Sequence, residues 1–252
     1  MKDSLKELTG HKNLVLTDSG DSAIEKAFGI AKKQGRALLI ADQGGWFSYK
    51  KLPKKLDLEV REIKTDYGLV DFNSLKKEKD CALILTSFAG YFAEQDTEEI
   101  SSICKQNNIL FIEDITGIIG YKKIYGDIAV CSFAKWKPIN FGSGGFISSN
   151  QELDFEDEFD FDEKLADKIK DLPNRYKLFF ENVEKIKKDL SDFEILHKDK
   201  KGLNVVVKFS SEEEKSEIIK YCEKNNYEWV LCPNYVKVNT DAISIEVKRI
   251  GN

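Results

Sequence analysis

The 252-residue sequence predicts an α/β fold, with a mostly parallel sheet, helices on both of its faces, and a small α+β domain at the C-terminal end. Two observations carry the prediction. Short continuous apolar runs alternate with helix-like segments up to about residue 150, as is typical of strands buried on both faces of a parallel sheet. From residue 203 onward the order becomes strand, helix, strand, strand. We therefore expect a large domain over 1–160 and a small domain over 161–252.

The elements of the large domain follow one another in simple order. After an opening helix, the runs that we expect to form strands are 13–17, 37–40, 58–63 (an edge strand), 82–86, 109–112, 128–133 and 145–148. Helical spacing of apolar residues predicts helices over 22–34 and 97–107. Ligands of such sheets bind at the carboxyl ends of the strands, so the segments that follow the strands are the candidate site.

The second part of the chain begins with a strongly acidic segment, 151–164, which we expect to be a solvated linker or the start of a helix. Apolar residues at helical spacing predict a long helix over 175–190. The remaining pattern predicts a strand at 203–209, a helix at 211–225 and strands at 227–231 and 243–247.

Composition argues against several classes of function. The formal charge of -5 gives no general attraction to nucleic acid, and no apolar run reaches the roughly 20 residues of a membrane span. The N-terminus lacks the apolar region of a secretory signal, so we expect a cytoplasmic protein. The five cysteines form no CxxC pair and are expected as buried free thiols. With only two histidines, neither a zinc site nor Ser-His-Asp catalysis is expected.

Two segments after predicted strands could hold a ligand. The turn at 17–24 contains Ser19-Gly20-Asp21-Ser22 ahead of a helix, where backbone N–H groups and hydroxyls could bind a phosphate. The same residues could simply cap the helix. The segment 42–49 places a Gly-Gly step before Trp46, whose ring could lie flat against a planar ligand or pack as an ordinary buried aromatic.

Two further segments carry reactive groups. Glu113 and Asp114 close an apolar strand, where a buried carboxylate needs a partner: a ligand nitrogen, a cap or a salt bridge. A later strand ends near Ser132, and Lys137 follows shortly after it, before a Gly-rich turn. A partly desolvated lysine there could be a nucleophile, although most lysines after a strand are exposed.

Together these segments resemble the DegT/DnrJ family of pyridoxal-5'-phosphate (PLP) dependent aminotransferases, a branch of the aspartate-aminotransferase superfamily with fold type I. The residues that match the family pattern in the right order are Ser19-Gly20, Glu113-Asp114, Gly126-Asp127, Ser132-Phe133, Lys137 and Gly142 with Gly144-Gly145. The resemblance covers roughly residues 10–150, and the tail only in general pattern.

The resemblance implies a role for each site residue. Lys137 would hold the cofactor as a Schiff base and shuttle a proton, and Asp114 would keep the pyridine nitrogen protonated. Trp46 would stack on the ring. The residues implied around the phosphate are Ser19, Gly20, Asp21, Ser22 and Ser132. The implied function is transfer of an amino group from an amino-acid donor to a keto or sugar-linked acceptor, by a homodimer.

The sequence departs from the family pattern at several positions. Asp21 stands where the family has a threonine, and Gly117 where it has Gln or His. The Asn-x-Arg segment that normally reaches the partner subunit has only a faint echo in Asn174-Arg175. Arg249 could bind a substrate carboxylate or be an ordinary surface residue. A PLP-dependent lyase, and a non-catalytic or regulatory descendant of the fold, therefore stay open as alternatives.

Overall fold

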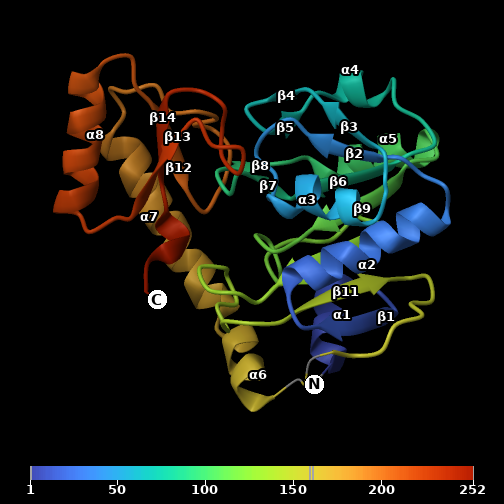
Figure 1. Cartoon of the computed structure of the whole chain (residues 1–252). Helices are drawn as coiled ribbons and strands as arrows, with labels where there is room; N and C mark the ends of the chain where they lie inside the picture. Colours follow the sequence, from blue (N-terminus) through green and yellow to red (C-terminus); the bar gives the residue numbers. More distant parts are fainter. Residues whose placement is uncertain (1, 159, 161, 252) are drawn as a thin grey trace.

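The computed structural model describes residues 2–158, 160 and 162–251, and its largest feature is a seven-stranded sheet (Figure 1). The strand order is β1 (Asn13–Thr17), β11 (Gly145–Ser149), β10 (Ile128–Ser132), β9 (Leu110–Asp114), β6 (Ala82–Thr86), β2 (Leu38–Ala41) and β3 (Val60–Ile63). The strands from β10 to β3 pair in parallel, and β11 is antiparallel to both of its neighbours. The predicted α/β fold class is therefore confirmed, with 58–63 at the edge as expected.

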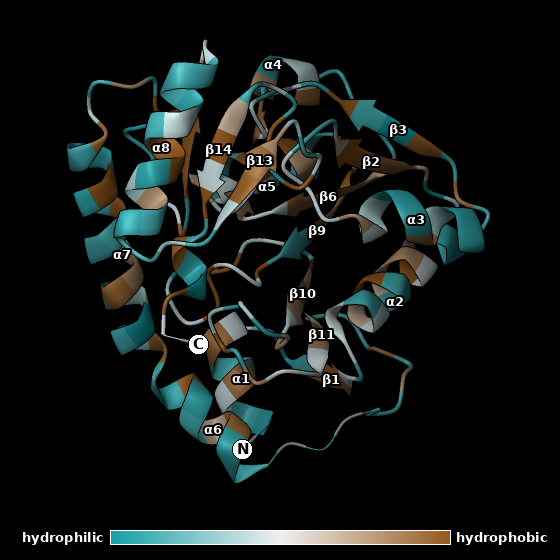
Figure 2. Cartoon of the chain, turned by 60° about the vertical axis from the view of Figure 1, so that its left-hand side comes forward, coloured by the Kyte–Doolittle hydropathy of each residue, from teal (hydrophilic) through white to brown (hydrophobic). Residues whose placement is uncertain are grey.

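Side chains that alternate along the strands build a core on each face of this sheet. Strand residues such as Ile40 and Ile84 pack with α2 (Gly20–Lys33) and α3 (Ser48–Lys55) on one face. Their sequence neighbours pack on the other face, against α4 (Phe72–Leu75), α5 (Thr97–Gln106) and α1 (Lys2–Thr9). The central strands are accordingly mostly apolar, whereas the edge strand β3 is largely exposed and the helices are amphipathic (Figure 2).

The C-terminal part forms a second, antiparallel sheet with the order β12 (Val205–Lys208), β14 (Ala242–Ile245) and β13 (Trp229–Cys232). It is covered by α8 (Glu212–Lys224), and a short 3₁₀ helix (Val247–Arg249) follows β14. After α6 (Glu163–Lys170), the long helix α7 (Leu172–Asp189) runs from the first sheet to the second (Figure 1). One apolar cluster contains Cys131 from the first sheet, Phe179 from α7 and Ile243 from the second, so the core is continuous between them.

Short hairpins complete the fold beside the sheet. They pair β4 (Thr65–Asp66) with β5 (Leu69–Val70), and β7 (Phe88–Ala89) with β8 (Ala93–Glu94). The five cysteines are buried free thiols, as expected. None of the described helices combines the length and apolar content that a bilayer crossing needs. No cluster of potential metal ligands occurs among the described residues.

Two element boundaries next to the predicted site differ from the sequence prediction, each for a local reason. Helix α2 begins at Gly20 rather than at residue 22, because the Ser19 hydroxyl caps it by accepting from the Ser22 N–H. Strand β9 continues through Glu113 and Asp114 rather than ending at 112. The buried Glu113 carboxylate is accommodated there by the hydroxyl of Ser87 and the N–H groups of Tyr125 and Gly126.

The described part of the acidic linker is mostly exposed, as expected, but two of its carboxylates bind the rest of the chain. Its Asp157 accepts from the backbone N–H of Leu16 and from the amine of Lys2. Its Glu158 bonds to Lys26 of helix α2 at 2.7 Å. These contacts tie the linker along the outer edge of the first sheet before α6 begins.

Candidate active site

One cavity of about 600 Å³ lies where the two parts of the chain meet, at the carboxyl ends of β9 and β10. The N-terminus of α2 and the loop after β10 form one side of it. The segment from Val230 to Arg249 closes the other. The lining contains seven of the eight residues that the sequence singles out: Ser19, Gly20, Asp21, Trp46, Asp114, Ser132 and Lys137.

Lys137 points into this cavity from the loop after β10. Its amine donates a hydrogen bond to the Tyr91 hydroxyl at 3.0 Å, and lies 4.6 Å from the centre of the Trp46 ring. Burial lowers the pKa of Lys137 to about 8, the charge of Asp114 opposing that shift in part. The amine therefore spends an appreciable fraction of time neutral near pH 7, as a nucleophilic lysine must.

The loop that carries Lys137 is fixed by a residue of α7. Arg175 is buried, and its Nε donates to the carbonyl of Pro138 at 2.7 Å. Its guanidinium also lies 5.1 Å from the centre of the Phe179 ring. Arg175, which faintly echoes the family's Asn-x-Arg segment, thus anchors the lysine loop within its own chain.

Asp114 is the last residue of β9, and its buried carboxylate has two donors. The Tyr49 hydroxyl donates to Oδ2 at 2.7 Å, and the Thr116 N–H to Oδ1 at 3.0 Å. Burial, reinforced by the charge of Asp114, raises the pKa of Tyr49 well above its usual value, so Tyr49 stays a donor. The structure thus places Asp114 and Lys137 in one cavity, with Asp114 held in a fixed orientation.

The start of α2 and the end of β10 form an anion cradle. The Ser19 hydroxyl caps α2, and Gly20 packs so closely on Ser132 that a Cβ on Gly20 would lie 2.5 Å from the Ser132 Cβ. Only glycine therefore lets the N–H groups of α2 lie beside the Ser132 hydroxyl. Free N–H groups at a helix start, together with a hydroxyl, are well suited to a phosphate.

The two residues that follow Gly20 in the expected phosphate turn lie differently with respect to the cavity. Ser22 does not line the cavity, because it lies on the outer side of α2 and donates its hydroxyl to Glu158 at 2.6 Å. Its assignment as a cofactor residue is therefore not supported by its position. Asp21 does line the cavity, and its carboxylate accepts from Trp46 Nε1 at 2.8 Å and from the Ser48 hydroxyl at 2.7 Å.

Gly117 lies against the aromatic rings of Phe88 and Tyr91. A Cβ on Gly117 would lie 3.1 Å from Phe88 and 3.5 Å from the Tyr91 ring, so a larger residue at 117 would crowd both aromatics. The family's Gln or His is thus replaced by a glycine with the buried Tyr91 beside it. Neither Tyr49 nor Tyr91 stands out in the sequence as a site residue, although Tyr91 follows a predicted strand and its loop.

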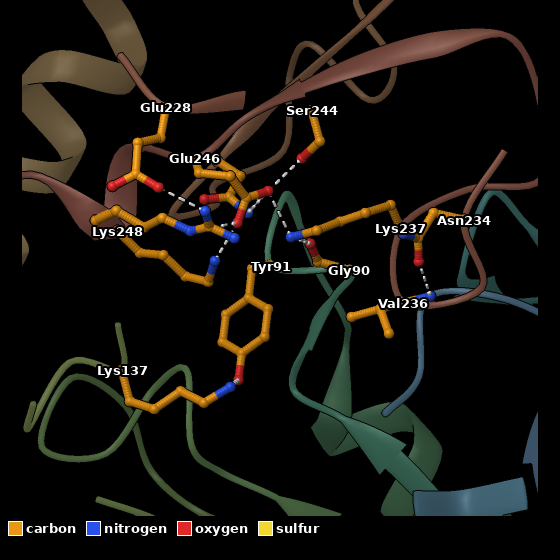
Figure 3. Close-up of polar contacts among 12 residues, drawn as sticks. Gly90, Tyr91, Lys137, Glu228, Asn234, Val236, Lys237, Ser244, Glu246 and Lys248 are labelled. Carbon is orange, nitrogen blue, oxygen red and sulfur yellow. Dashed lines mark hydrogen bonds and ion pairs between the residues drawn. The ribbon is translucent and has the colours of Figure 1, made fainter. Parts of the chain in front are cut away.

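The opposite side of the cavity is a cationic wall that we define as Lys237, Lys248 and Arg249, grouped around the carboxylate of Glu246 (Figure 3). Lys237 bonds to Glu246 Oε1 at 2.7 Å, Lys248 bonds to Oε2, and Arg249 Nε lies 3.6 Å from Oε2. Burial, strengthened by the charge of Lys237, holds the pKa of Lys248 well below its usual value. Burial alone would raise the pKa of Glu246, but the two lysines lower it.

The cationic wall faces Lys137 across the Tyr91 ring (Figure 3). The amines of Lys137, Lys248 and Lys237 lie 4.9, 5.1 and 5.5 Å from the centre of that ring. Arg249, which the sequence left open as a substrate or surface residue, lines the cavity. It pairs with Glu228 at 2.6 Å and lies 4.6 Å from the centre of the Trp136 ring.

Two protein-family models match this chain. The model of the DegT/DnrJ/EryC1/StrS aminotransferase family matches residues 2–164, and the model named MJ1341 family C-terminal domain matches residues 173–252. The first match covers more than half of the chain. The protein therefore belongs to the DegT/DnrJ/EryC1/StrS aminotransferase family.

Solved structures share the fold at low sequence identity. The chain is similar to 3-amino-5-hydroxybenzoic acid synthase at 13% identity and a TM-score of 0.73, over 99% of this chain and 85% of that one. It is also similar to Escherichia coli GDP-4-keto-6-deoxy-D-mannose-3-dehydratase with bound hydrated PLP, at 13% identity and a TM-score of 0.72. That match covers 96% of this chain and 85% of the other. A NifS-like protein from Rickettsia africae matches at 16% identity and a TM-score of 0.68. That match covers 100% of this chain and 79% of the other.

Family membership identifies PLP as the cofactor, and most of the cavity fits it. A buried amine of lowered pKa suits the cofactor's aldehyde, and the fixed carboxylate of Asp114 suits its pyridine nitrogen. The Gly20–Ser132 contact leaves a cradle that a side chain at residue 20 would fill. The residue that does not suit the cofactor's phosphate is Asp21, whose carboxylate stands in that cradle.

Proposed function

We propose that this protein is a PLP-dependent aminotransferase that takes an amino group from an amino-acid donor and passes it to a keto or sugar-linked acceptor. The observation that carries the proposal is the placement of Lys137, Asp114 and Trp46 in the lining of one cavity, with the start of α2 as an anion cradle. When bound, PLP supplies an electron sink that stabilises negative charge at the substrate carbon next to the amine.

The residues of this chain divide the work at that cofactor. Lys137 would hold it and carry a proton at its Nζ. Tyr91 keeps the Lys137 amine in place through the 3.0 Å hydrogen bond. Asp114, fixed by Tyr49, would keep the cofactor's ring nitrogen protonated. Trp46 would cover the ring, with its indole held by Asp21.

The cationic wall supports an amino-acid donor. Within it, Glu246 forms ion pairs with two buried lysines, and Arg249 forms an ion pair with Glu228. The wall thus presents three basic side chains and the carboxylate of Glu246 to a cavity that is otherwise largely apolar. Arg249, whose guanidinium stays charged, is suited to a carboxylate of the substrate, and the wall lies across the Tyr91 ring from Lys137.

We also propose that the protein works as a homodimer, with the cavity mouth at the interface. Phe47 and Trp136 line the cavity, yet 54% and 45% of their surfaces are exposed, which is unusual for large apolar side chains. Light scattering on the purified protein should give twice the mass of one chain, and Phe47→Ser with Trp136→Ser should lower it. A monomeric wild type would contradict this part of the proposal.

The experiment that tests the reaction mixes the PLP-loaded protein with single amino acids and follows its visible absorbance. An aminotransferase should lose the band of the lysine-bound cofactor and release the 2-oxo acid of its donor in amounts equal to the enzyme. Addition of the acceptor should restore the band. Loss of water or of another group from the substrate, without an equivalent of 2-oxo acid from the donor, would indicate a dehydratase or lyase instead.

A second candidate, a non-catalytic descendant of the fold, is favoured by Asp21 and Gly117. The same measurement separates the two. With a non-catalytic protein, the spectrum of added PLP would change with each amino acid only as it does without protein, in the wild type and in Lys137→Ala alike.

A further inference from the structure

We infer that Asp21 is a specificity residue of the cofactor site, whose carboxylate makes the cradle accept a singly charged phosphate group in preference to the dianion. The inference deepens the proposed function and rests on its cofactor. It predicts that PLP binds less tightly, relative to pyridoxal, as the pH rises through the second ionisation of the phosphate.

The position of Asp21 carries the inference. Asp21 is the second residue of α2, directly after Gly20, whose close contact with Ser132 shapes the cradle. A phosphate that accepts from the first N–H groups of α2 therefore lies next to the Asp21 side chain. The favourable end of the helix dipole is already partly neutralised by this carboxylate, before any ligand arrives.

The carboxylate is also held in place. Trp46 Nε1 donates to one oxygen at 2.8 Å, and the Ser48 hydroxyl donates to the other at 2.7 Å. Rotation of Asp21 away from a phosphate would break both hydrogen bonds, and would release the indole that covers the cofactor's ring. The charge and the Trp46 orientation are therefore linked through one side chain.

A second carboxylate reduces the cradle's donors from the outer side. Glu158 of the linker accepts the hydroxyl proton of Ser22 at 2.6 Å, and the Asp18 N–H donates to it at 3.3 Å. Two donors of the phosphate turn are thus directed at Glu158 rather than into the cavity. Lys26 balances the charge of Glu158 at 2.7 Å, on the outer face of α2.

The other charged groups around the cavity do not remove the effect. Asp114 and Glu246 line it as further carboxylates, each with donors of its own. The cations that line it are Lys135, Lys137, Lys237, Lys248 and Arg249. Of these, the last three belong to the cationic wall on the opposite side, and Lys137 is the residue that the cofactor's aldehyde engages.

The size of the effect follows from the charges. A phosphate monoester passes from one negative charge to two near pH 6. Beside a carboxylate near the protein surface, the additional charge would weaken binding by roughly tenfold or more. Pyridoxal, which lacks the phosphate, should not feel Asp21 in this way.

The test compares PLP with pyridoxal as ligands of the wild type, Asp21→Asn and Asp21→Thr between pH 5.5 and 8. Quenching of tryptophan fluorescence gives each Kd without any donor or turnover. For the wild type we expect the ratio of PLP affinity to pyridoxal affinity to fall about tenfold from the low to the high pH, because both ligands meet the same Lys137 amine and only PLP carries the phosphate. Asp21→Asn keeps an acceptor for Trp46, and should bind PLP about tenfold more tightly at pH 8 with pyridoxal affinity unchanged within about twofold.

Glu158→Gln serves as the matched control, because it removes the charge of a carboxylate outside the cavity while its amide oxygen can still accept from Ser22 and Asp18. It should change PLP affinity by less than about threefold. The inference is overturned if Asp21→Asn and Asp21→Thr bind PLP no more tightly than the wild type, or if PLP and pyridoxal shift together. Transfer activity is not part of this readout, so a protein that shows the predicted ratios and no transfer would refute only the proposed function.

Discussion

The two sides of the cavity are built on different principles. The side formed by α2, β9, β10 and the Lys137 loop carries its groups at strand ends and helix starts, where local backbone geometry sets their direction. The cationic wall depends instead on one buried carboxylate, Glu246, which pairs with Lys248 two residues later and with Lys237 nine residues earlier. The first side therefore follows a pattern of strand ends, whereas the second depends on buried ion pairs that no such pattern indicates.

The largest expected effect belongs to the first side. Lys137→Ala removes the amine that holds the cofactor and carries the proton, so transfer activity should fall by about 10³-fold or more. Steady-state rates and the visible spectrum of the loaded protein check this. Lys135→Ala is the control, because it changes a lysine two residues away that lines the same cavity. Equal activity losses in the two variants would mean that Lys137 has no role that Lys135 lacks.

Glu246→Gln should break the second side. The substitution leaves Lys237, Lys248 and Arg249 around an uncharged amide, and loss of one partner from a buried ion pair typically costs about 3–5 kcal/mol. Urea denaturation measures the free energy of unfolding. Glu228→Gln, at the exposed end of the same wall, should cost less than about 1 kcal/mol. Similar losses for both would mean that Glu246 does not organise the wall.

Asp114→Asn should lower activity by about 10²-fold, because an amide cannot keep the ring nitrogen protonated by a charge. Tyr49→Phe tests how much of that role depends on orientation. It removes one donor to Asp114 and should reduce activity by about tenfold or less. Both variants should still bind PLP through Lys137, as the absorbance of the loaded protein can verify. If Tyr49→Phe lowered activity as much as Asp114→Asn does, Tyr49 would have a role in the reaction beyond orienting Asp114.

The smallest effect concerns the free amine. Because the pKa of Lys137 is lowered to about 8, its neutral fraction rises through pH 8 and is nearly complete by pH 9. Competitive acetylation of the cofactor-free protein, read by mass spectrometry, should show a midpoint near 8 for Lys137. In the denatured chain the midpoint should return to about 10.4, the value of an unperturbed lysine. A midpoint above 10 in the folded protein would mean that the site does not desolvate this amine.

Much of the fold and one side of the site could be predicted from the sequence. Buried parallel strands are continuous apolar runs, and Lys137, Asp114 and Ser132 stand at or just after their ends. These are local relations. The division into domains at 160 and 161 also came from local pattern, and it stays a prediction.

The remainder of the site depends on contacts between distant residues. Lys237 donates to the carbonyl of Gly90, 147 residues earlier in the chain, and no local pattern in either segment indicates this. Tyr49 looks like an ordinary helix residue until the fold brings it to Asp114. Ser22 shows the opposite case. It belongs to a recognisable local motif, but its hydroxyl donates to Glu158, more than a hundred residues later and outside the cavity.

The central claim, that Lys137 holds the cofactor in this cavity, can be tested without knowledge of any substrate. The protein is incubated with PLP, reduced with borohydride, digested, and analysed by mass spectrometry. The account predicts one phosphopyridoxyl group per chain, on Lys137, in competition with all other lysines. A label spread over several lysines, or placed mainly on Lys135, Lys237 or Lys248, would contradict it.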